Sequence, residues 1–299
     1  MKIGIDLGGS HIGIGIVENN GKIIEKVEKR LMSKEKRNIK NSIESYIIEN
    51  VKKMQEKYEI TEMGIAVPGT ISKNIIVKSV NLGIKDYNLI ENLQKEIKIP
   101  IKIRNDAKCA AIAESKYGVL KQYNRSIFLT LGTGIGGAVI INNQLLDTGD
   151  LPGCEFGHII IEKDGIPCNC GKKGCFEKYA SMKAFKNNLR EALELDERTR
   201  GEELLDKIRK NSKENKDYDI INNVVGEYIK NLAIGISNLI NIFEPEAIGI
   251  GGSFVFFEDV FLDKLKQYIQ KENLLFNPRE NLIIETAVLN NDAGIIGSV

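Results

Sequence analysis

The sequence lacks several features that mark large classes of protein. Its charges nearly cancel, because 42 Lys and Arg residues stand against 41 Asp and Glu residues for a net charge of +1. It has no apolar run near the roughly 20 residues of a membrane-spanning helix. Its opening residues, MKIGIDLGGS, show no basic region, apolar region or cleavage site of a signal peptide. We therefore expect a cytoplasmic protein that binds neither nucleic acid nor a membrane.

Histidine and cysteine are scarce, with two His and five Cys in the chain. Three of the cysteines gather at Cys168, Cys170 and Cys175, whereas Cys109 and Cys154 stand apart. An odd number of cysteines in a reducing compartment argues against a framework of disulfides.

The 299 residues suffice for two domains, and 42% apolar with 28% charged residues is the balance of a soluble globular protein. Strand, glycine turn and strand follow one another over residues 2–17 and again over residues 126–141, which suggests an internal duplication. A third glycine turn ends the strand AIGIGGS at 247–253. We expect a boundary near 118–125, with domains at 1–118 (plus about 290–299) and 119–289.

Helices are expected at about 38–58, from Asp106 to Gly118, and along the apolar stripe that runs from Val224 to Phe243. Short buried strands are expected in MGIAVPG and IPIKIRND. The charged stretch at 196–219 is interpreted as a solvated helix and loop.

The three glycine turns suit a phosphate ligand, because backbone N–H groups can approach phosphate oxygens only where no Cβ obstructs them. Gly132, Gly134 and Gly137 spell G-x-G-x-x-G, but an apolar strand follows instead of the helix of a dinucleotide site. No P-loop motif occurs. Each turn alone could be a plain hairpin; three together, two of them with a hydroxyl at Ser10 and Thr133, favour phosphate binding.

Two acidic positions follow predicted strands. Asp6, near the end of the first strand, could hold Mg²⁺ through water or simply cap a turn. Asn105-Asp106 stands where a strand ends and a helix begins, so it could be a helix cap or could supply a general base for a kinase.

His158, Cys168, Cys170 and Cys175 are the ligand types of a closed tetrahedral zinc site, and the tight spacing with intervening glycines suits a metal knuckle at 155–177. Buried cysteines with a core histidine, or a redox pair, are the alternatives; the redox pair is weaker because Cys-x-Cys lacks the usual spacing. Glu155 and Glu177 bracket the knuckle, where they could accept hydrogen bonds from vicinal hydroxyls or be solvated surface residues.

These motifs together resemble the ROK family (repressors, uncharacterised reading frames and sugar kinases). The matching segments, in order along the whole chain, are DLGGS at 6–10, VPG at 67–69, NDA at 105–107, LGTGIGGA at 131–138, EFGH at 155–158, CNCGKKGCFE at 168–177, IGGS at 250–253 and NDAGIIG near the end.

The resemblance implies two α/β domains of the actin-like ATPase (ribonuclease H-like) fold, with ATP and a sugar in a cleft between them and a zinc knuckle beside the sugar. It implies Asp106 as the base that deprotonates a sugar hydroxyl, the 6-OH of a hexose, with Mg²⁺ and ATP as cofactors, structural Zn²⁺, and a homodimer. The implied sugar ligands are Gly69, Asn81, Asn105, Asp106, Glu155, His158 and Glu177. The expected ATP contacts are Asp6, Gly8, Gly9, Ser10, His11, Gly132, Thr133, Gly134, Gly136, Gly137, Gly251 and Gly252.

The chain departs from the family in two places. Ser10-His11 replaces the common Thr-Lys, which keeps a hydroxyl but reduces positive charge, and the closing segment after NDAGIIG is short. We expect an ATP-dependent hexose kinase, with glucose as first substrate and N-acetylmannosamine or another hexose such as allose as alternatives. A sugar-responsive repressor or a non-catalytic sugar-binding module is the rival: the repressor is disfavoured by a start without a helix-turn-helix, and the module by the presence of Asp106.

Overall fold

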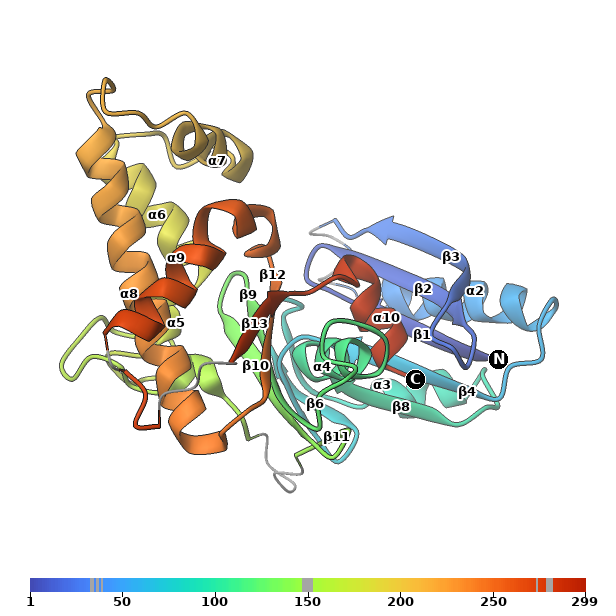
Figure 1. Ribbon diagram of the computed structural model, residues 1–299. Coiled ribbons are helices and arrows are strands. Elements are labelled where there is room, and N and C mark those ends of the chain that lie inside the picture. Colours follow the sequence, from blue (N-terminus) through green and yellow to red (C-terminus); the bar gives the residue numbers. More distant parts are fainter. Residues whose placement is uncertain (33–34, 36–37, 39, 147–152, 273, 278–281) are drawn as a thin grey trace. The chain divides into compact units, whose positions relative to one another are not determined.

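The computed structural model describes residues 1–32, 35, 38, 40–146, 153–272, 274–277 and 282–299 (Figure 1). They form two compact units. The first comprises Met1–Asn124, Ala138–Cys154 and Val288–Val299, and the second comprises Arg125–Gly137 and Glu155–Ala287. Residues 138–154 are thus grouped with the first unit, whereas the sequence assigns them to the second domain. The boundaries of independently folding domains stay a prediction.

The first unit is built on five strands, β1 (Lys2–Leu7), β2 (His11–Val17), β3 (Ile23–Arg30), β4 (Glu62–Val67) and β8 (Ile101–Asn105). Their order is β3-β2-β1-β4-β8. β1 pairs antiparallel with β2, and β2 with β3, as expected where strand, glycine turn and strand follow one another with no helix between them. β4 lies parallel to β1 and to β8, so these three strands end at the same edge.

The helices of this unit are α2 (Ser45–Gln55), α3 (Leu89–Gln94), α4 (Asp106–Tyr117) and α10 (Ala293–Gly297), with a π-helical turn η1 (Lys40–Glu44) and a 3₁₀ turn η4 (Asn290–Asp292). The helix expected at 38–58 is confirmed over α2, which buries Ile47, Val51 and Met54 on one face; it is preceded by the π-helical turn, and Ile39 lies outside the described residues. α4 begins at Asp106 and ends at Tyr117 with Gly118 as its C-cap, which agrees with the predicted start at Asp106 and stop at Gly118.

The short closing helix α10 is a core element. It packs against α4 and β1, and Figure 1 shows it in red beside the blue strands. Glycines allow this approach: a Cβ on Gly4 would lie 2.0 Å from the Ile295 carbonyl oxygen, and one on Gly64 would lie 1.9 Å from that of Ser298. No larger residue fits at these two strand positions without moving the helix.

A second, three-stranded antiparallel sheet of β5 (Thr70–Ser72), β6 (Ile75–Ser79) and β7 (Ile84–Tyr87) also belongs to the first unit. The hairpin between β5 and β6 turns through Lys73 and Asn74, both with positive φ (47° and 63°). Two successive residues in the left-handed region are the geometry of a tight hairpin turn. This sheet is not among the elements expected from the sequence.

A further sheet has the order β11-β10-β9-β12-β13. Its strands are β9 (Arg125–Leu131), β10 (Ile135–Ile141), β11 (Gln144–Leu145), β12 (Ala247–Gly252) and β13 (Ile283–Thr286), and the division between the units falls inside β10. The repeated strand, glycine turn and strand is therefore confirmed. β12 runs parallel to β9 and β13.

The helices of the second unit are α5 (Glu177–Ala180), α6 (Met182–Ala192), α7 (Gly201–Arg209), α8 (Tyr218–Phe243) and α9 (Glu258–Lys271), with 3₁₀ turns η2 (Phe156–His158) and η3 (Val255–Phe257). α8 carries the predicted apolar stripe and ends at Phe243, with its C-cap Glu244 in the left-handed region (φ 48°). α6, α8 and α9 enclose Phe185, Tyr228 and Phe261, whose ring centroids lie 4.8–4.9 Å apart.

The charged stretch at 196–219 contains the expected helix, α7, but this helix also buries Leu204, Leu205 and Ile208. Among the helices that the structure describes, none combines the length and the apolar character needed to cross a membrane.

Candidate active site and metal centre

The carboxyl edge of the first unit's sheet gathers several of the predicted sugar and catalytic residues. Asn105 ends β8 and caps α4, its side-chain oxygen accepting from the Lys108 backbone N–H at 3.2 Å. Its amide nitrogen donates to the carbonyl oxygen of Gly69 at 3.0 Å. The helix-cap interpretation of Asn105 is thus confirmed, and the same side chain also fixes the loop after β4.

Only glycine fits at position 69. Its φ is +109°, and a Cβ there would lie 2.2 Å from the carbonyl oxygen of Lys78. Both facts exclude a larger residue, so the close approach of this loop to β6 is what brings the Gly69 carbonyl within reach of Asn105.

The carboxylates of Asp6 and Asp106 lie near enough at this edge for the charge of Asp106 to affect the pKa of Asp6. Burial raises the pKa of Asp6 to about 7, with the negative charge of Asp106 as the next cause. Burial also raises the pKa of Asp106 above its ordinary value, and the backbone N–H of Ala107 opposes this. A carboxylate whose proton affinity is raised by burial is a better general base at neutral pH than a solvated one.

The first glycine turn joins β1 to β2. The backbone N–H of Gly8 donates to the carbonyl oxygen of His11 at 3.0 Å and closes the turn. Ser10 is exposed. A Cβ on Gly9 would lie 3.0 Å from the Cβ of Asn81. Asn81, an expected sugar ligand, is therefore a neighbour of Gly9, an expected ATP contact.

The second and third glycine turns lie side by side in the second unit, because Gly252 at the end of β12 pairs with Leu131 at the end of the parallel strand β9. Gly252 has φ +74°, and its Cβ would lie 2.6 Å from the Leu131 carbonyl oxygen. At Gly132 a Cβ would meet nothing within 4 Å, so its face is open to a ligand. This open backbone fits a phosphate group.

Not every glycine of these turns is open in this way. A Cβ on Gly137 would lie 2.4 Å from the Phe128 carbonyl oxygen, and one on Gly251 would lie 2.7 Å from the Phe128 ring. At these two positions, close packing against Phe128 is a sufficient reason for glycine without any ligand. Thr133 is exposed and Gly136 is half-buried.

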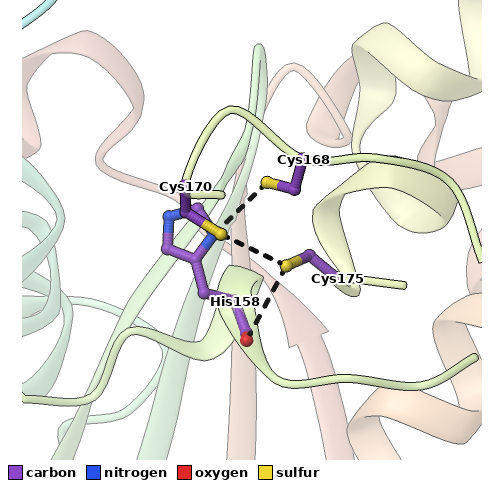
Figure 2. A group of neighbouring side chains, drawn as sticks. All are labelled: His158, Cys168, Cys170 and Cys175. Atoms are coloured by element: carbon purple, nitrogen blue, oxygen red, sulfur yellow. Dashed lines mark hydrogen bonds between the residues drawn. The ribbon is translucent and has the colours of Figure 1, made fainter. Parts of the chain in front are cut away.

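The four predicted metal ligands converge in the second unit, as Figure 2 shows. The ligand atoms of His158, Cys168, Cys170 and Cys175 all lie within 4.8 Å of one another. Cys168 Sγ lies 3.7 Å from His158 Nδ1, and Cys170 Sγ lies 3.5 Å from Cys175 Sγ.

These separations match a tetrahedral zinc site. With zinc–sulfur bonds of about 2.3 Å and zinc–nitrogen bonds of about 2.1 Å, two sulfurs lie about 3.8 Å apart and a sulfur and a nitrogen about 3.6 Å apart. The donor set therefore fits Zn²⁺ in chemistry, and these two separations are close to the zinc spacing. Nδ1 is the ring nitrogen that faces the sulfurs, which leaves Nε2 of His158 for another partner.

The thiol groups differ in acidity. Burial raises the pKa of Cys168 and raises that of Cys175 to about 12, whereas the backbone N–H of Lys172 lowers the pKa of Cys170. A metal binds thiolates, so loading of this cluster releases protons.

Two residues that the sequence analysis did not single out hold the knuckle. Lys172 Nζ donates to the His158 carbonyl oxygen at 2.8 Å, and the Ile166 backbone N–H donates to the Tyr179 hydroxyl at 2.6 Å. The sequence separation of these two residues from the metal ligands follows no periodic pattern. Their contacts could therefore be found only in the folded structure.

The two glutamates beside the knuckle differ in environment. Glu155 is exposed and precedes η2, its carbonyl oxygen accepting from the His158 N–H at 3.0 Å. Glu177 begins α5 with a side chain that is 22% exposed, and its Oε1 lies 3.7 Å from His158 Nδ1. Its Oε2 would lie 2.5 Å from a Cβ on Gly134, so Glu177 also contacts the second glycine turn.

Comparison with known proteins agrees with this architecture. The model of the ROK family matches residues 2–299. The chain is 30% identical to a glucokinase of Halalkalibacterium halodurans over 99% of this chain and 92% of that protein. It is also 29% identical to a xylose repressor of Caldicellulosiruptor bescii, over 99% of this chain and 76% of the repressor.

A solved structure has the same fold. The Lmo2764 protein of Listeria monocytogenes, described as a candidate N-acetylmannosamine kinase, superposes with a TM-score of 0.82 at 26% identity, covering 100% of this chain and 97% of the other. The prediction of a mixed α/β fold of the actin-like type seen in ROK sugar kinases is confirmed. With the family model matching nearly every residue and a relative at 30% identity aligned almost end to end, the chain belongs to the ROK family.

Proposed function

We propose that this chain is an ATP-dependent sugar kinase that transfers the γ-phosphoryl group of ATP to a hexose hydroxyl. Membership of the family is compatible with either a kinase or a regulator, since relatives bear both kinds of name. The observation that carries the proposal is Asp106, a half-buried carboxylate at the start of α4 whose pKa burial raises. Sugar binding alone would need no base.

In the proposed reaction, Asp106 accepts the proton of the sugar hydroxyl, for which we propose the 6-OH. The hydroxyl oxygen forms a bond to the γ-phosphorus while the bond from that phosphorus to the bridging oxygen of ADP breaks. Backbone N–H groups of the glycine turns at Gly8–Ser10, Gly132–Gly134 and Gly251–Gly252 would bind the phosphates. Asp6 is the proposed carboxylate for Mg²⁺, which neutralises phosphate charge when bound.

The sugar is proposed to contact Gly69, Asn81 and Asn105 as well as the Glu155, His158 and Glu177 group. Asn105 supports this role because its capping and Gly69 hydrogen bonds orient it. His158 supports it because a metal on Nδ1 would fix Nε2 as the donor to a hydroxyl.

Zinc is proposed to be structural. All four positions of the tetrahedron would be filled by protein, so none remains for a reacting water. The knuckle is too short to enclose an apolar core of its own, and the metal would therefore order the segment that carries Glu155 and Glu177.

The test is release of ADP in the presence of Mg·ATP and a panel of hexoses. Asp106→Asn is expected to lower kcat by at least about 100-fold, because general-base catalysis contributes about 10²–10⁴-fold. Asp263→Asn, an exposed aspartate on α9, is the matched control and should leave kcat unchanged. Full turnover by Asp106→Asn would overturn the base assignment.

Glucose is the proposed substrate, with N-acetylmannosamine second and allose or another hexose after it. The glucokinase relative favours glucose, and the candidate N-acetylmannosamine kinase is the reason for the second choice. Comparing kcat/KM for these sugars decides between them, and a higher value for the acetylated sugar would reverse the ranking. We also propose a homodimer, which sedimentation or light scattering tests directly.

A regulator is the second candidate, because a xylose repressor is among the relatives. It predicts sugar binding without ADP release for every sugar tested. Measurable glucose affinity with no turnover in the presence of Mg·ATP would favour this alternative over the kinase.

A further inference from the structure

The first unit contains a cavity of about 290 Å³ that the proposed reaction does not use. It lies between the amino ends of β1 and β4, the edge strand β8, the second half of α4 and the β10–β11 hairpin. The side chains that matter here are Lys2, Glu62, Lys102, Arg104, Ser115 and Lys116. Its size is near the lower limit for small-molecule pockets, so it suits a compact ligand.

The charged side chains of this lining are mostly cationic. Four are basic and one, Glu62, is acidic, which gives +3 in a protein whose overall charge is only +1. Glu62 is already engaged, because its two oxygens pair with Lys2 at 2.6 Å and with Lys102 at 2.8 Å. It therefore leaves little negative charge for the other two cations.

Arg104 and Lys116 have no carboxylate within ion-pair distance among the described residues. The surroundings also act on Lys116: burial lowers its pKa, and the charges of Lys2 and Arg104 lower it further. Like charges held together around a cavity repel one another, and a bound anion would relieve that repulsion.

The donors also suit a tetrahedral oxyanion. Arg104 offers a planar fork of N–H groups and Lys116 offers a point charge, whereas the Ser115 hydroxyl already donates to the Ile112 carbonyl oxygen at 3.0 Å. We propose that this cavity is an anion site for a phosphate group, either free or carried by a small metabolite.

The cavity is lined by the same two elements that hold the proposed base, Asp106. Arg104 immediately precedes Asn105 on β8, and Ser115 and Lys116 lie on α4, whose first residue is Asp106. Strand β8 and helix α4, which hold Asp106 between them, therefore also line the cavity. Along the axis of α4, Asp106 lies about 14 Å from Ser115 and Lys116.

The test is isothermal titration of the full chain with inorganic phosphate at constant chloride, with saturating AMPPNP present to occupy the glycine turns. The wild-type protein is expected to bind phosphate under these conditions. Arg104→Gln and Lys116→Gln should each weaken binding about tenfold, as the loss of one charge-assisted contact predicts. Lys264→Gln, an exposed lysine on α9, makes the same charge change elsewhere and should have no effect.

Glu62→Gln provides a test of opposite sign. Removing its charge frees Lys2 and Lys102, so phosphate binding should become tighter. Repeating the titration with glucose 6-phosphate and with sulfate distinguishes a metabolite from a free anion. The proposal fails if phosphate does not bind beside AMPPNP, or if Arg104→Gln and Lys116→Gln both bind it as the wild type does.

Discussion

The carboxylate of Glu177 occupies the space that a side chain at Gly134 would need, with Oε2 lying 2.5 Å from the position of a Cβ. The second glycine turn and the zinc knuckle are thus in direct contact through one side chain. Gly134→Ala should displace the flexible end of the Glu177 side chain and raise the KM for the sugar, with little change in the free energy of unfolding, because only a carboxylate has to move.

Gly132→Ala is the matched control for stability, because a Cβ there meets nothing within 4 Å. Thermal unfolding of both variants gives the comparison. An unchanged sugar KM in Gly134→Ala would show that Glu177 moves aside without consequence.

Asp106 should cost stability in the ligand-free protein. Its pKa is raised in the folded state by burial, so the penalty is absent at low pH, grows as the pH rises above the ordinary value of 3.8, and is complete above the folded-state pKa. Asp106→Asn should therefore raise Tm at pH 8 by at least about 2 °C, with the gain disappearing toward pH 4. Calorimetry at the two pH values checks this, and a lower Tm at pH 8 contradicts it.

Zinc should be present at one ion per chain in protein purified without a chelator, as elemental analysis would show. Chelation or Cys170→Ser should raise the KM for the sugar before it affects that for ATP, because Glu177 and His158 belong to the same knuckle. Cys154→Ser, outside the four-residue cluster, is the control. Absence of zinc, or an unchanged sugar KM in Cys170→Ser, would contradict a structural zinc site.

Glu114 should be a stability determinant despite its charge. The side chain is fully buried, and its carboxylate accepts backbone N–H groups of Val119, Val288 and Leu289 at 2.8–3.0 Å. Glu114→Gln replaces one acceptor with a donor and should cost about 2–3 kcal/mol. Glu227→Gln on exposed α8 surface should stay within about 0.5 kcal/mol, and equal denaturant midpoints for the two would refute this role.

The sequence predicted those parts of the fold that local pattern determines. The strands around each glycine turn, the start of α4 at Asp106 and the gathering of His158 with three cysteines all follow from short-range signals. The three-stranded sheet of β5–β7 was missed because its strands are only three to five residues long. The roles of Glu114, Lys172 and Tyr179 were missed because their partners are set by tertiary contacts rather than by spacing.

The glycine contacts beneath α10 also dictate an order of events during synthesis. Residues 1–124 emerge from the ribosome first, but the helix that fills the space above Gly4 and Gly64 lies within 288–299. Between them the ribosome must make residues 125–287, which takes roughly 10–30 s at about 5–20 residues per second. During that interval the nascent first unit lacks the helix that covers Gly4 and Gly64, so a translational stall before residue 288 would leave a chain exposed to chaperones and proteases.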